Sequence, residues 1–255
     1  AGRPLTVAEI FVRSSNVGAG MLALEAGAER QRAFFDRLGL TASIKTEAGP
    51  VAAPLLPAHW NKVETITLAY GHGIALAPLQ FAAAAAALVN GGRRVTPTLL
   101  RRLPGDMVAG DAVVTPETSR VMRELMRRNV TDPAGTGRKA AAAGYRVGGK
   151  TGTAELAVKG GYKANAVISS FLAAFPMDAP RYVALVMIFE PMPTKEAQGQ
   201  LAAGNNAAPT AGRLIERIAP LLGIMPAGAA EPIDDAAPVV DSGRAAFDGM
   251  DDAKY

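Results

Sequence analysis

The most constraining feature of this sequence is a change of pattern at Tyr145, after which three strand-like stretches follow one another. They are rich in β-branched, aromatic and other apolar residues and comprise Tyr145–Leu156, Ala166–Phe175 and Tyr182–Glu190. Glycines and prolines between them allow successive strands to pair antiparallel, with the third strand left as an apolar, unpaired edge. The amphipathic segment Ala207–Leu222 is then predicted to form a helix over one face of the sheet.

Helical patterns dominate the chain before this sheet. Thr6-Val7-Ala8-Glu9 has the spacing of a capping box and predicts a short helix over Val7–Arg13, with two more helices before Gly39. A further helix is expected between Pro78 and Asn90, and another from Thr115 to Asp132. The sequence therefore predicts an α+β chain, with an antiparallel sheet flanked by helices and a mainly helical subregion, and a cleft between the two regions.

Composition narrows the class of protein. The 255 residues include no cysteine, which excludes a disulfide framework and a thiol nucleophile, and no His or Cys spacing typical of a metal site occurs. We therefore expect no metal and no cofactor. Dispersed arginines and few aromatic residues argue against nucleic-acid binding. No stretch is long and apolar enough to cross a bilayer, so any membrane anchor is expected upstream of this sequence.

The last thirty residues, 226–255, differ in composition from the rest. They are rich in alanine, proline and aspartate and carry a net charge of −5, so the +4 of the whole chain leaves about +9 for residues 1–225. Few large apolar side chains are available there to offset the entropy of ordering. We expect residues 1–225 to fold and residues 226–255 to form a flexible acidic tail.

Two short motifs contain residues suited to acyl-transfer chemistry. Val147–Glu155 contains Lys150-Thr151-Gly152-Thr153 in a strand-like context, where the adjacent glycines allow an extended peptide to add to the strand edge. Ser14-Ser15-Asn16 lies where the first helix is expected to stop. Alone, Ser14 would most simply cap a helix and Lys150 would be a solvated edge charge. The two motifs together favour a catalytic interpretation.

Six motifs in one fixed order resemble the transpeptidase domain of class B penicillin-binding proteins. They are Ser14-Ser15-Asn16-Val17-Gly18, Tyr70-Gly71-His72-Gly73, Pro78-Leu79-Gln80, Asn90-Gly91-Gly92, Gly135-Thr136-Gly137 and Gly144 through Ala154. Asn16 makes the division-specific FtsI family the nearest branch. The resemblance implies a penicillin-binding protein or serine β-lactamase-like transpeptidase fold, present in part, with residues 1–225 as its carboxy-terminal portion.

The same resemblance implies roles for individual residues. Catalytic roles fall to Ser14, as a proton relay, to Asn16, as an amide that binds lysine and substrate, and to Lys150, as a source of positive potential. Substrate-binding roles fall to Ser15, Thr151, Gly152, Thr153 and Tyr162. Among these, the hydroxyls of Thr151 and Thr153 would hold a substrate carboxylate, and the Thr153 N–H would form half of an oxyanion hole.

The nucleophile of that family lies in a Ser-x-x-Lys motif, which this sequence lacks. None of its seven serines has a lysine three residues later: Ser14, Ser15, Ser43, Ser119, Ser169, Ser170 and Ser242. We expect the motif upstream of Ala1, and we expect the present chain to be inactive alone and less stable than an extended one. Thr136 has a lysine at the same spacing, but a glycine-flanked turn is not a nucleophile-bearing helix.

By resemblance, the parent protein is a peptidoglycan D,D-transpeptidase of cell division. It would join stem peptides through a serine acyl-enzyme, be acylated by β-lactam antibiotics, and use the stem pentapeptide as substrate. It would be anchored in the inner membrane, face the periplasm, and work beside a septal glycosyltransferase and other division proteins.

Two alternatives remain open at this point. A serine β-lactamase shares the motifs, but no glutamate here is followed by asparagine four residues on, as the deacylating loop of class A requires. A non-catalytic scaffold with a penicillin-binding-like site fits the missing nucleophile directly. Truncation also explains the absence of the strands that precede the nucleophile in the family, whereas loss of catalysis alone does not.

Overall fold

The computed structural model describes residues 3–103, 110–158, 161–195, 197 and 199–227. The expected tail, 226–255, lies outside the described residues except for its first two positions. Two compact units divide the chain at residue 119, the first holding the residues up to Ser119 and the second beginning at Arg120. No helix among the described residues is long and apolar enough to span a membrane.

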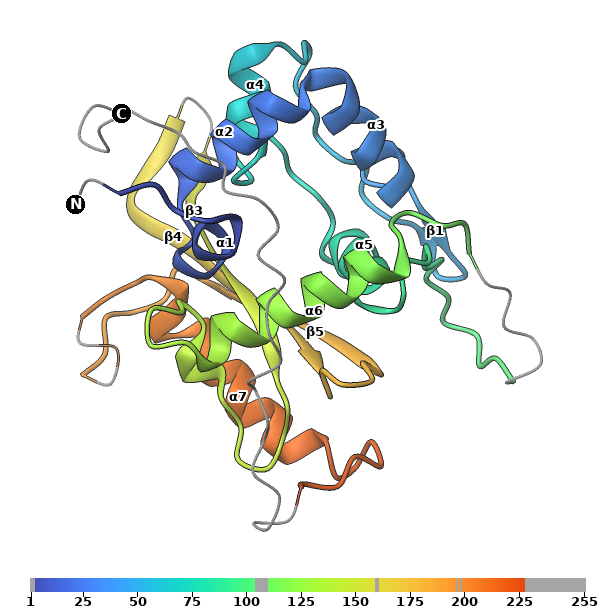
Figure 1. The fold of residues 1–255 in the computed structure, drawn as a ribbon, viewed down its shortest axis with the longest axis vertical. Helices are drawn as coiled ribbons and strands as arrows, with labels where there is room; N and C mark the ends of the chain where they lie inside the picture. Colours follow the sequence, from blue (N-terminus) through green and yellow to red (C-terminus); the bar gives the residue numbers. More distant parts are fainter. Residues whose placement is uncertain (1–2, 104–109, 159–160, 196, 198, 228–255) are drawn as a thin grey trace. The chain divides into compact units, whose positions relative to one another are not determined.

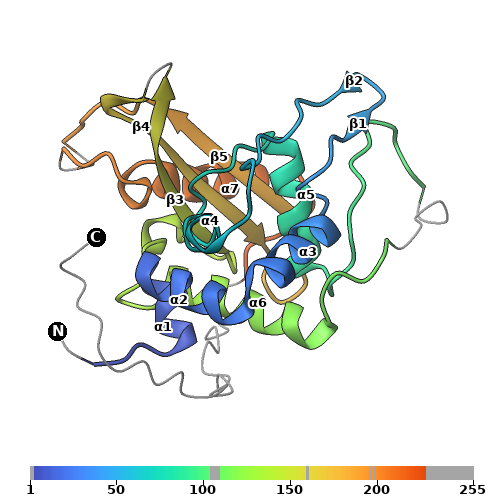
Figure 2. The ribbon, with the colours of Figure 1, turned by 90° about the horizontal axis from the view of Figure 1, so that it is seen from above.

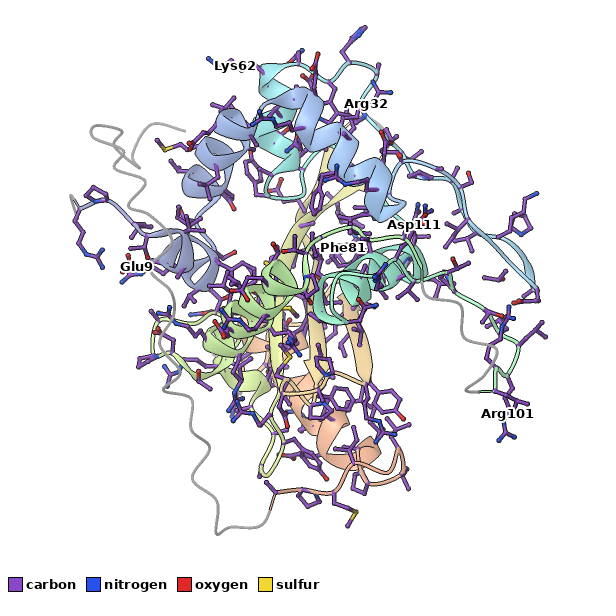
Figure 3. The ribbon with its side chains drawn as sticks, turned by 45° about the vertical axis from the view of Figure 1, so that its right-hand side comes forward. Glu9, Arg32, Lys62, Phe81, Arg101 and Asp111 are labelled. Atoms are coloured by element: carbon purple, nitrogen blue, oxygen red, sulfur yellow. The ribbon has the colours of Figure 1, made fainter. Side chains whose placement is uncertain are left out.

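The first unit is mainly helical (Figure 1). Its helices are α1 (Val7–Arg13), α2 (Asn16–Ala26), α3 (Ala28–Leu38), α4 (Lys62–Leu68) and α5 (Pro78–Val89). A two-residue strand β1 (Lys45–Thr46) pairs antiparallel with β2 (Gly49–Pro50). The predicted capping box is confirmed, because the Thr6 side chain accepts from the Glu9 N–H and the Glu9 carboxylate accepts from the Thr6 N–H. Glu9 lies in the first turn of α1 (Figure 3).

Helix α5 is held against α3 by apolar packing and one buried amide. Ala84 and Ala87 are buried in a cluster with Leu38, Leu40 and Val113, which confirms that the alanines of this helix allow close packing. Gln80 is also buried, and its Nε2 donates to the carbonyls of Gly39 at 2.7 Å and Ala42 at 2.8 Å. The amide therefore satisfies carbonyls just beyond the end of α3.

Helix α6 (Pro116–Thr131) crosses the boundary between the units. Thr115 starts it, with its hydroxyl accepting from the Thr118 N–H at 3.1 Å. Leu125, Met126 and Val130 are buried along its apolar side, as the sequence predicted. Asn129 lies on the same side and is fully buried.

The second unit contains a three-stranded antiparallel sheet in the order β3-β4-β5. Its strands are β3 (Gly148–Val158), β4 (Gly161–Phe175) and β5 (Tyr182–Phe189). Lys150 lies opposite Leu172 and Thr153 opposite Ser169, and the register shifts between Glu155 and Ala157. Among the described strands, β5 pairs only with β4, which confirms that it forms an edge.

Helix α7 (Ala207–Ile218) covers one face of this sheet, as Figure 2 shows. Ala207, Ala208, Ala211 and Ile215 are its buried side, and they share a core with Val147, Phe171, Ala173 and Phe175. Small residues on α7 let the helix approach the large rings of β4 closely. The predicted helix-over-sheet arrangement is confirmed.

Several predicted boundaries were wrong. β3 begins at Gly148 rather than Tyr145, and β4 begins at Gly161, five residues before the predicted Ala166. α7 ends at Ile218 rather than Leu222, since Pro220 has no N–H to continue the ladder. The short helix α4, capped by Asn61, was not predicted.

Candidate active site

Ser14 occupies the turn between α1 and α2 in a left-handed conformation. Its φ is 58° and its ψ is 47°, which is uncommon for a residue other than glycine. The Ser14 N–H donates to Phe11 O at 3.2 Å, so its backbone caps the carboxyl end of α1. Its side chain is exposed. A strained, exposed serine held by backbone bonds is typical of a functional position.

Ser15 and Asn16 begin the next helix. The Ser15 hydroxyl accepts from the Gly18 N–H at 3.1 Å and is the N-cap of α2. A Cβ at Gly18 would lie 2.6 Å from Ile10, so a glycine is required for α1 and α2 to meet at this turn. Asn16 is exposed in the first turn of α2. The side chain that caps a helix at this turn is therefore that of Ser15, at the start of α2.

The second set of predicted site residues lies on β3, at the edge of the sheet. Gly149 allows β3 to approach β4, because a Cβ there would lie 2.4 Å from both Leu172 O and the Phe171 ring. Gly152 is opposite Ser170, whose hydroxyl donates to Gly152 O at 3.1 Å. The second edge of β3 has no partner among the described strands, as an incoming extended peptide requires.

Lys150 is not the solvated charge that an edge lysine normally is. Its side chain is partly buried, and its Nζ donates to Thr151 O at 3.1 Å. Burial disfavours the charged form and lowers the pKa of the Lys150 ammonium to about 8. A lysine with this pKa can both attract an anion and exchange a proton near neutral pH.

Thr151 and Thr153 face polar groups from outside the sheet. The Thr151 hydroxyl lies 2.7 Å from the Thr136 hydroxyl, in the loop after α6. The Thr153 Oγ1 accepts from the Ala203 N–H at 3.0 Å, at the start of a 3₁₀ turn (Ala203–Asn205). Thr153 is exposed and Thr151 is partly buried.

Tyr162 was predicted to line the substrate site from a hairpin tip. Its backbone lies in β4 opposite Ala157, while its side chain lies outside what the structure describes. Sequence reasoning missed Asn129, whose Nδ2 donates to Gly149 O at 2.9 Å. The available signal was an amide on the apolar side of α6, next to Val130 and one turn after Leu125.

The structure thus groups the site residues in two sets. Ser14, Ser15 and Asn16 form one turn in the first unit, whereas Lys150 through Thr153 lie in the second unit with Asn129, Thr136 and Ala203 as neighbours. No group of three His, Cys, Asp or Glu side chains converges on a possible metal position within the described part of the chain.

Comparison with known proteins identifies the family to which a chain with these two sets of site residues belongs. The family model described as the penicillin binding protein transpeptidase domain matches residues 1–216. The chain belongs to this transpeptidase family. The match includes the Ser14 turn, the whole β3-β4-β5 sheet and most of α7, so the transpeptidase domain accounts for nearly all of the described residues.

Relatives of this transpeptidase domain come from several bacteria. The chain is 41% identical over 229 residues to a probable peptidoglycan D,D-transpeptidase FtsI of Caulobacter vibrioides, covering 86% of this chain and 38% of the relative. It is 36% identical over 177 residues to stage V sporulation protein D of Bacillus subtilis, covering 64% of this chain and 26% of the relative. The chain therefore spans well under half the length of these relatives.

Solved transpeptidase structures share the fold. The transpeptidase domain of Burkholderia pseudomallei penicillin-binding protein 3 matches with a TM-score of 0.79 and 30% identity, over 89% of this chain and 67% of that one. A Mycobacterium penicillin-binding protein 3 complexed with ampicillin matches with a TM-score of 0.75 and 27% identity, over 90% and 54% of the two chains. The predicted α+β transpeptidase fold is confirmed.

Proposed function

We propose that the protein to which this chain belongs is a peptidoglycan D,D-transpeptidase of cell division. The observation that carries the proposal is the Lys150-Thr151-Gly152-Thr153 segment on an open strand edge, with the pKa of Lys150 lowered to about 8 by burial. Similarity to the Caulobacter FtsI supports the same activity. In this proposal the reacting hydroxyl comes from a Ser-x-x-Lys segment outside the present sequence, so the chain alone is inactive.

The reaction proceeds in two acyl transfers. The serine oxygen attacks the penultimate D-Ala carbonyl of a stem pentapeptide, its proton passes to the departing amine, and the terminal D-Ala leaves. An amine of a second stem peptide then attacks the ester, which forms the cross-link, and a proton from that amine passes to the departing serine oxygen. A β-lactam ring is opened by the same serine and remains attached to it.

Each set of site residues has a part in this scheme. Ser14 relays the proton to the leaving amine, and the Asn16 amide hydrogen-bonds the substrate peptide. Lys150 supplies positive potential, Thr151 and Thr153 border the position of the terminal carboxylate, and the Thr153 N–H stabilises the oxyanion. Ser15 and Gly152 shape the substrate path, and Tyr162 borders the acyl pocket.

The proposed setting is the cell inner membrane, with the catalytic domain facing the periplasm. The anchor is a helix outside this sequence, and the partners are a septal glycosyltransferase and other division proteins. Similarity to FtsI of Caulobacter supports this setting.

Intact-mass measurement after incubation with penicillin tests the proposal. The present chain is compared with a form extended upstream by the next ~80 residues, because the Ser-x-x-Lys motif is expected in that extension. An adduct of one penicillin on the extended form alone is the expected result. No adduct on either form supports the alternative that the protein is a non-catalytic scaffold with a penicillin-binding-like site.

Turnover separates a transpeptidase from a β-lactamase. A transpeptidase keeps its penicillin adduct for a long time, whereas a β-lactamase hydrolyses a chromogenic cephalosporin repeatedly. We expect a stoichiometric adduct and no sustained hydrolysis by the extended form.

A further inference from the structure

An arm rich in arginine and leucine leaves the helical unit after α5. The arm comprises residues 93–103, which include four arginines and no acidic residue. At its base the Arg94 N–H donates to Asp111 O at 2.9 Å. A Cβ at Gly110 would lie 2.0 Å from Arg94 O, so the two sides of the base are in close backbone contact. Figure 3 shows Arg101 on the outer part of the arm and Asp111 at its base.

A carboxylate between β1 and β2 holds the arm at its middle. Glu47 accepts from the Thr98 hydroxyl at 2.6 Å and from the Leu99 N–H at 2.8 Å. The Thr98 hydroxyl bond, and after it the Leu99 N–H bond, lower the pKa of the Glu47 carboxyl. Glu47 therefore stays charged and keeps both bonds at neutral pH. The arm is fixed at two places, and its outer part follows directly after the second.

The outer part of the arm exposes large apolar side chains. Leu99, Leu100 and Leu103 are 66%, 59% and 61% exposed. Arg101 and Arg102 lie between them in the sequence and are also exposed. One exposed leucine on a surface is ordinary, but three within five positions are typical of an interaction site. The chemistry that fits this site is apolar and anionic at once.

The same sequence contains a segment with this chemistry. Residues 239–252 include four aspartates and one arginine, which gives a net charge of −3. Four large apolar residues are interspersed with the aspartates: Val239, Val240, Phe247 and Met250. Carboxylates form charge-assisted hydrogen bonds with arginine, and apolar side chains cover exposed leucines. By contrast, residues 228–238 contain one large apolar residue, Ile233.

The segment is tethered to the folded chain at a defined point. The Ala227 N–H donates to Gly144 O at 2.8 Å, and a Cβ at Gly144 would lie 2.6 Å from Pro226. Val239 comes 12 residues after Ala227, a length of chain that can extend to about 40 Å. A tethered segment whose linker spans the distance acts at an effective concentration of about a millimolar. Even a weak contact within the chain is therefore favoured over a dilute separate partner.

We propose that residues 239–252 dock on the 93–103 arm of the same chain, with their aspartates facing the arginines of the arm and their apolar side chains covering Leu99, Leu100 and Leu103. The acidic tail is then a built-in cover for an apolar, basic surface. Because exposed ion pairs supply part of the contact, salt weakens it. A more strongly anionic surface displaces the tail, so the arm becomes available only when such a surface is present.

Cross-linking between two introduced cysteines tests the contact in the upstream-extended protein. Thr96→Cys lies at an exposed position of the arm, and Ser242→Cys lies within the docking segment. Neither substitution removes an arginine, an aspartate or a leucine. The measured quantity is the initial rate of cross-linking by a short bismaleimide, with the linked peptides identified by mass spectrometry. We expect a cross-link within one molecule that slows at about 0.5 M salt, where the Debye length is short.

Charge reversal on each side tests whether the arginines of the arm make the contact. Arg101→Glu combined with Arg102→Glu is expected to lower the cross-linking rate about fivefold or more, because attraction becomes repulsion at two exposed pairs. Asp251→Arg combined with Asp252→Arg, added to that variant, is expected to restore most of the rate.

A matched control reverses two cations of the same unit that lie outside the arm. Arg30 and Lys62 are exposed, and Lys62 is labelled in Figure 3. Arg30→Glu combined with Lys62→Glu changes the net charge by the same amount as the reversal on the arm. It is expected to keep the cross-linking rate within about twofold of the unchanged protein.

Several outcomes overturn the proposal. They are equal rates with and without the reversal on the arm, an equal loss in the control, and no recovery when the aspartates are reversed as well. Ala245→Cys provides a second tail position, and no cross-link from either position also overturns it. A cross-link found only between two molecules assigns the arm to a second copy instead. Co-sedimentation with phosphatidylglycerol vesicles that is lost on reversal of the arm, without any cross-link to the tail, assigns it to a lipid surface.

Discussion

The Ser14 turn and the Lys150 strand are built in opposite ways. The hydrogen bonds described above for the Ser14-Ser15-Asn16 turn join residues within five positions of each other. The Lys150–Thr153 segment depends on Asn129, Thr136 and Ala203, which are 20, 15 and 50 positions from their partners. The first is fixed by local sequence, and the second exists only when the second unit is folded. Substitutions in the two regions should therefore differ in how much stability they remove and in how far along the chain their effects extend.

The largest effect is expected at Gly149. Gly149→Ala places a methyl group against Leu172 O and the Phe171 ring, which forces β3 and β4 apart and should lower the free energy of unfolding by about 3 kcal/mol. Urea denaturation of the extended protein measures this. Gly152→Ala is the matched control on the same strand, because its Cβ meets only the movable Ser170 hydroxyl, at 2.7 Å. Equal losses of stability in both variants would contradict the expectation that the close approach of β4 makes Gly149 the more sensitive position.

A smaller, pH-dependent effect is expected at Lys150. Its folded-state pKa of about 8 is below the ordinary value of 10.5, so the unfolded chain binds more protons between these values. Stability should therefore rise with pH from about 8 to about 10.5, by about 2 kcal/mol after allowance for partial exposure. Below pH 8 the full destabilisation by the buried charge remains.

Lys150→Met isolates this contribution, because methionine keeps the apolar part of the chain and does not titrate. The stability difference between the Lys150→Met variant and the wild-type protein should shrink as the pH rises from about 8 to about 10, as measured by urea denaturation at each pH. A difference that stays constant over this range would contradict a lowered pKa for Lys150. No comparable pH effect is expected from the Ser14-Ser15-Asn16 turn, which contains no ionisable side chain.

The smallest effect is expected at the local turn itself. Ser15→Ala removes the side-chain cap of α2 and should cost about 1 kcal/mol, because the Gly18 N–H loses its acceptor. Ser15→Asp keeps a capping oxygen and is the control. Hydrogen exchange of the α2 amides reports the change where it occurs. Increased exchange spread equally over β3 and β4 would show that the turn is coupled to the sheet more strongly than its local bonds suggest.

The same contrast explains what could be predicted from the sequence. Helices α1, α5 and α6 were predicted almost to the residue because Thr6, Pro78 and Thr115 are local start signals. The start of β4 was missed because the bulge at Glu155–Ala157 sets the pairing, and a bulge has no strong sequence signal. Helix α4 was missed because seven residues are too few for a clear period.

The candidate site divides along the same line. Lys150 and Thr153 were predicted as site residues from the Lys-Thr-Gly motif, and Ser14 from the Ser-x-Asn motif. The partners of Thr151 and Gly149 were not identified, because the strand register and the folding of the Thr136 loop onto α6 bring them together. Asn129 belongs to no motif in the sequence, and its role follows from which carbonyl it faces.

The lowered pKa of Lys150 also makes its side chain more nucleophilic near neutral pH than an ordinary lysine. At pH 7.4 about a fifth of Lys150 side chains are neutral amines, compared with about a thousandth for an ordinary lysine. Reagents that attack only neutral amines should therefore modify Lys150 ahead of the other lysines. A tag located on Lys150 by peptide mapping would report whether the strand edge beside it is open or occupied.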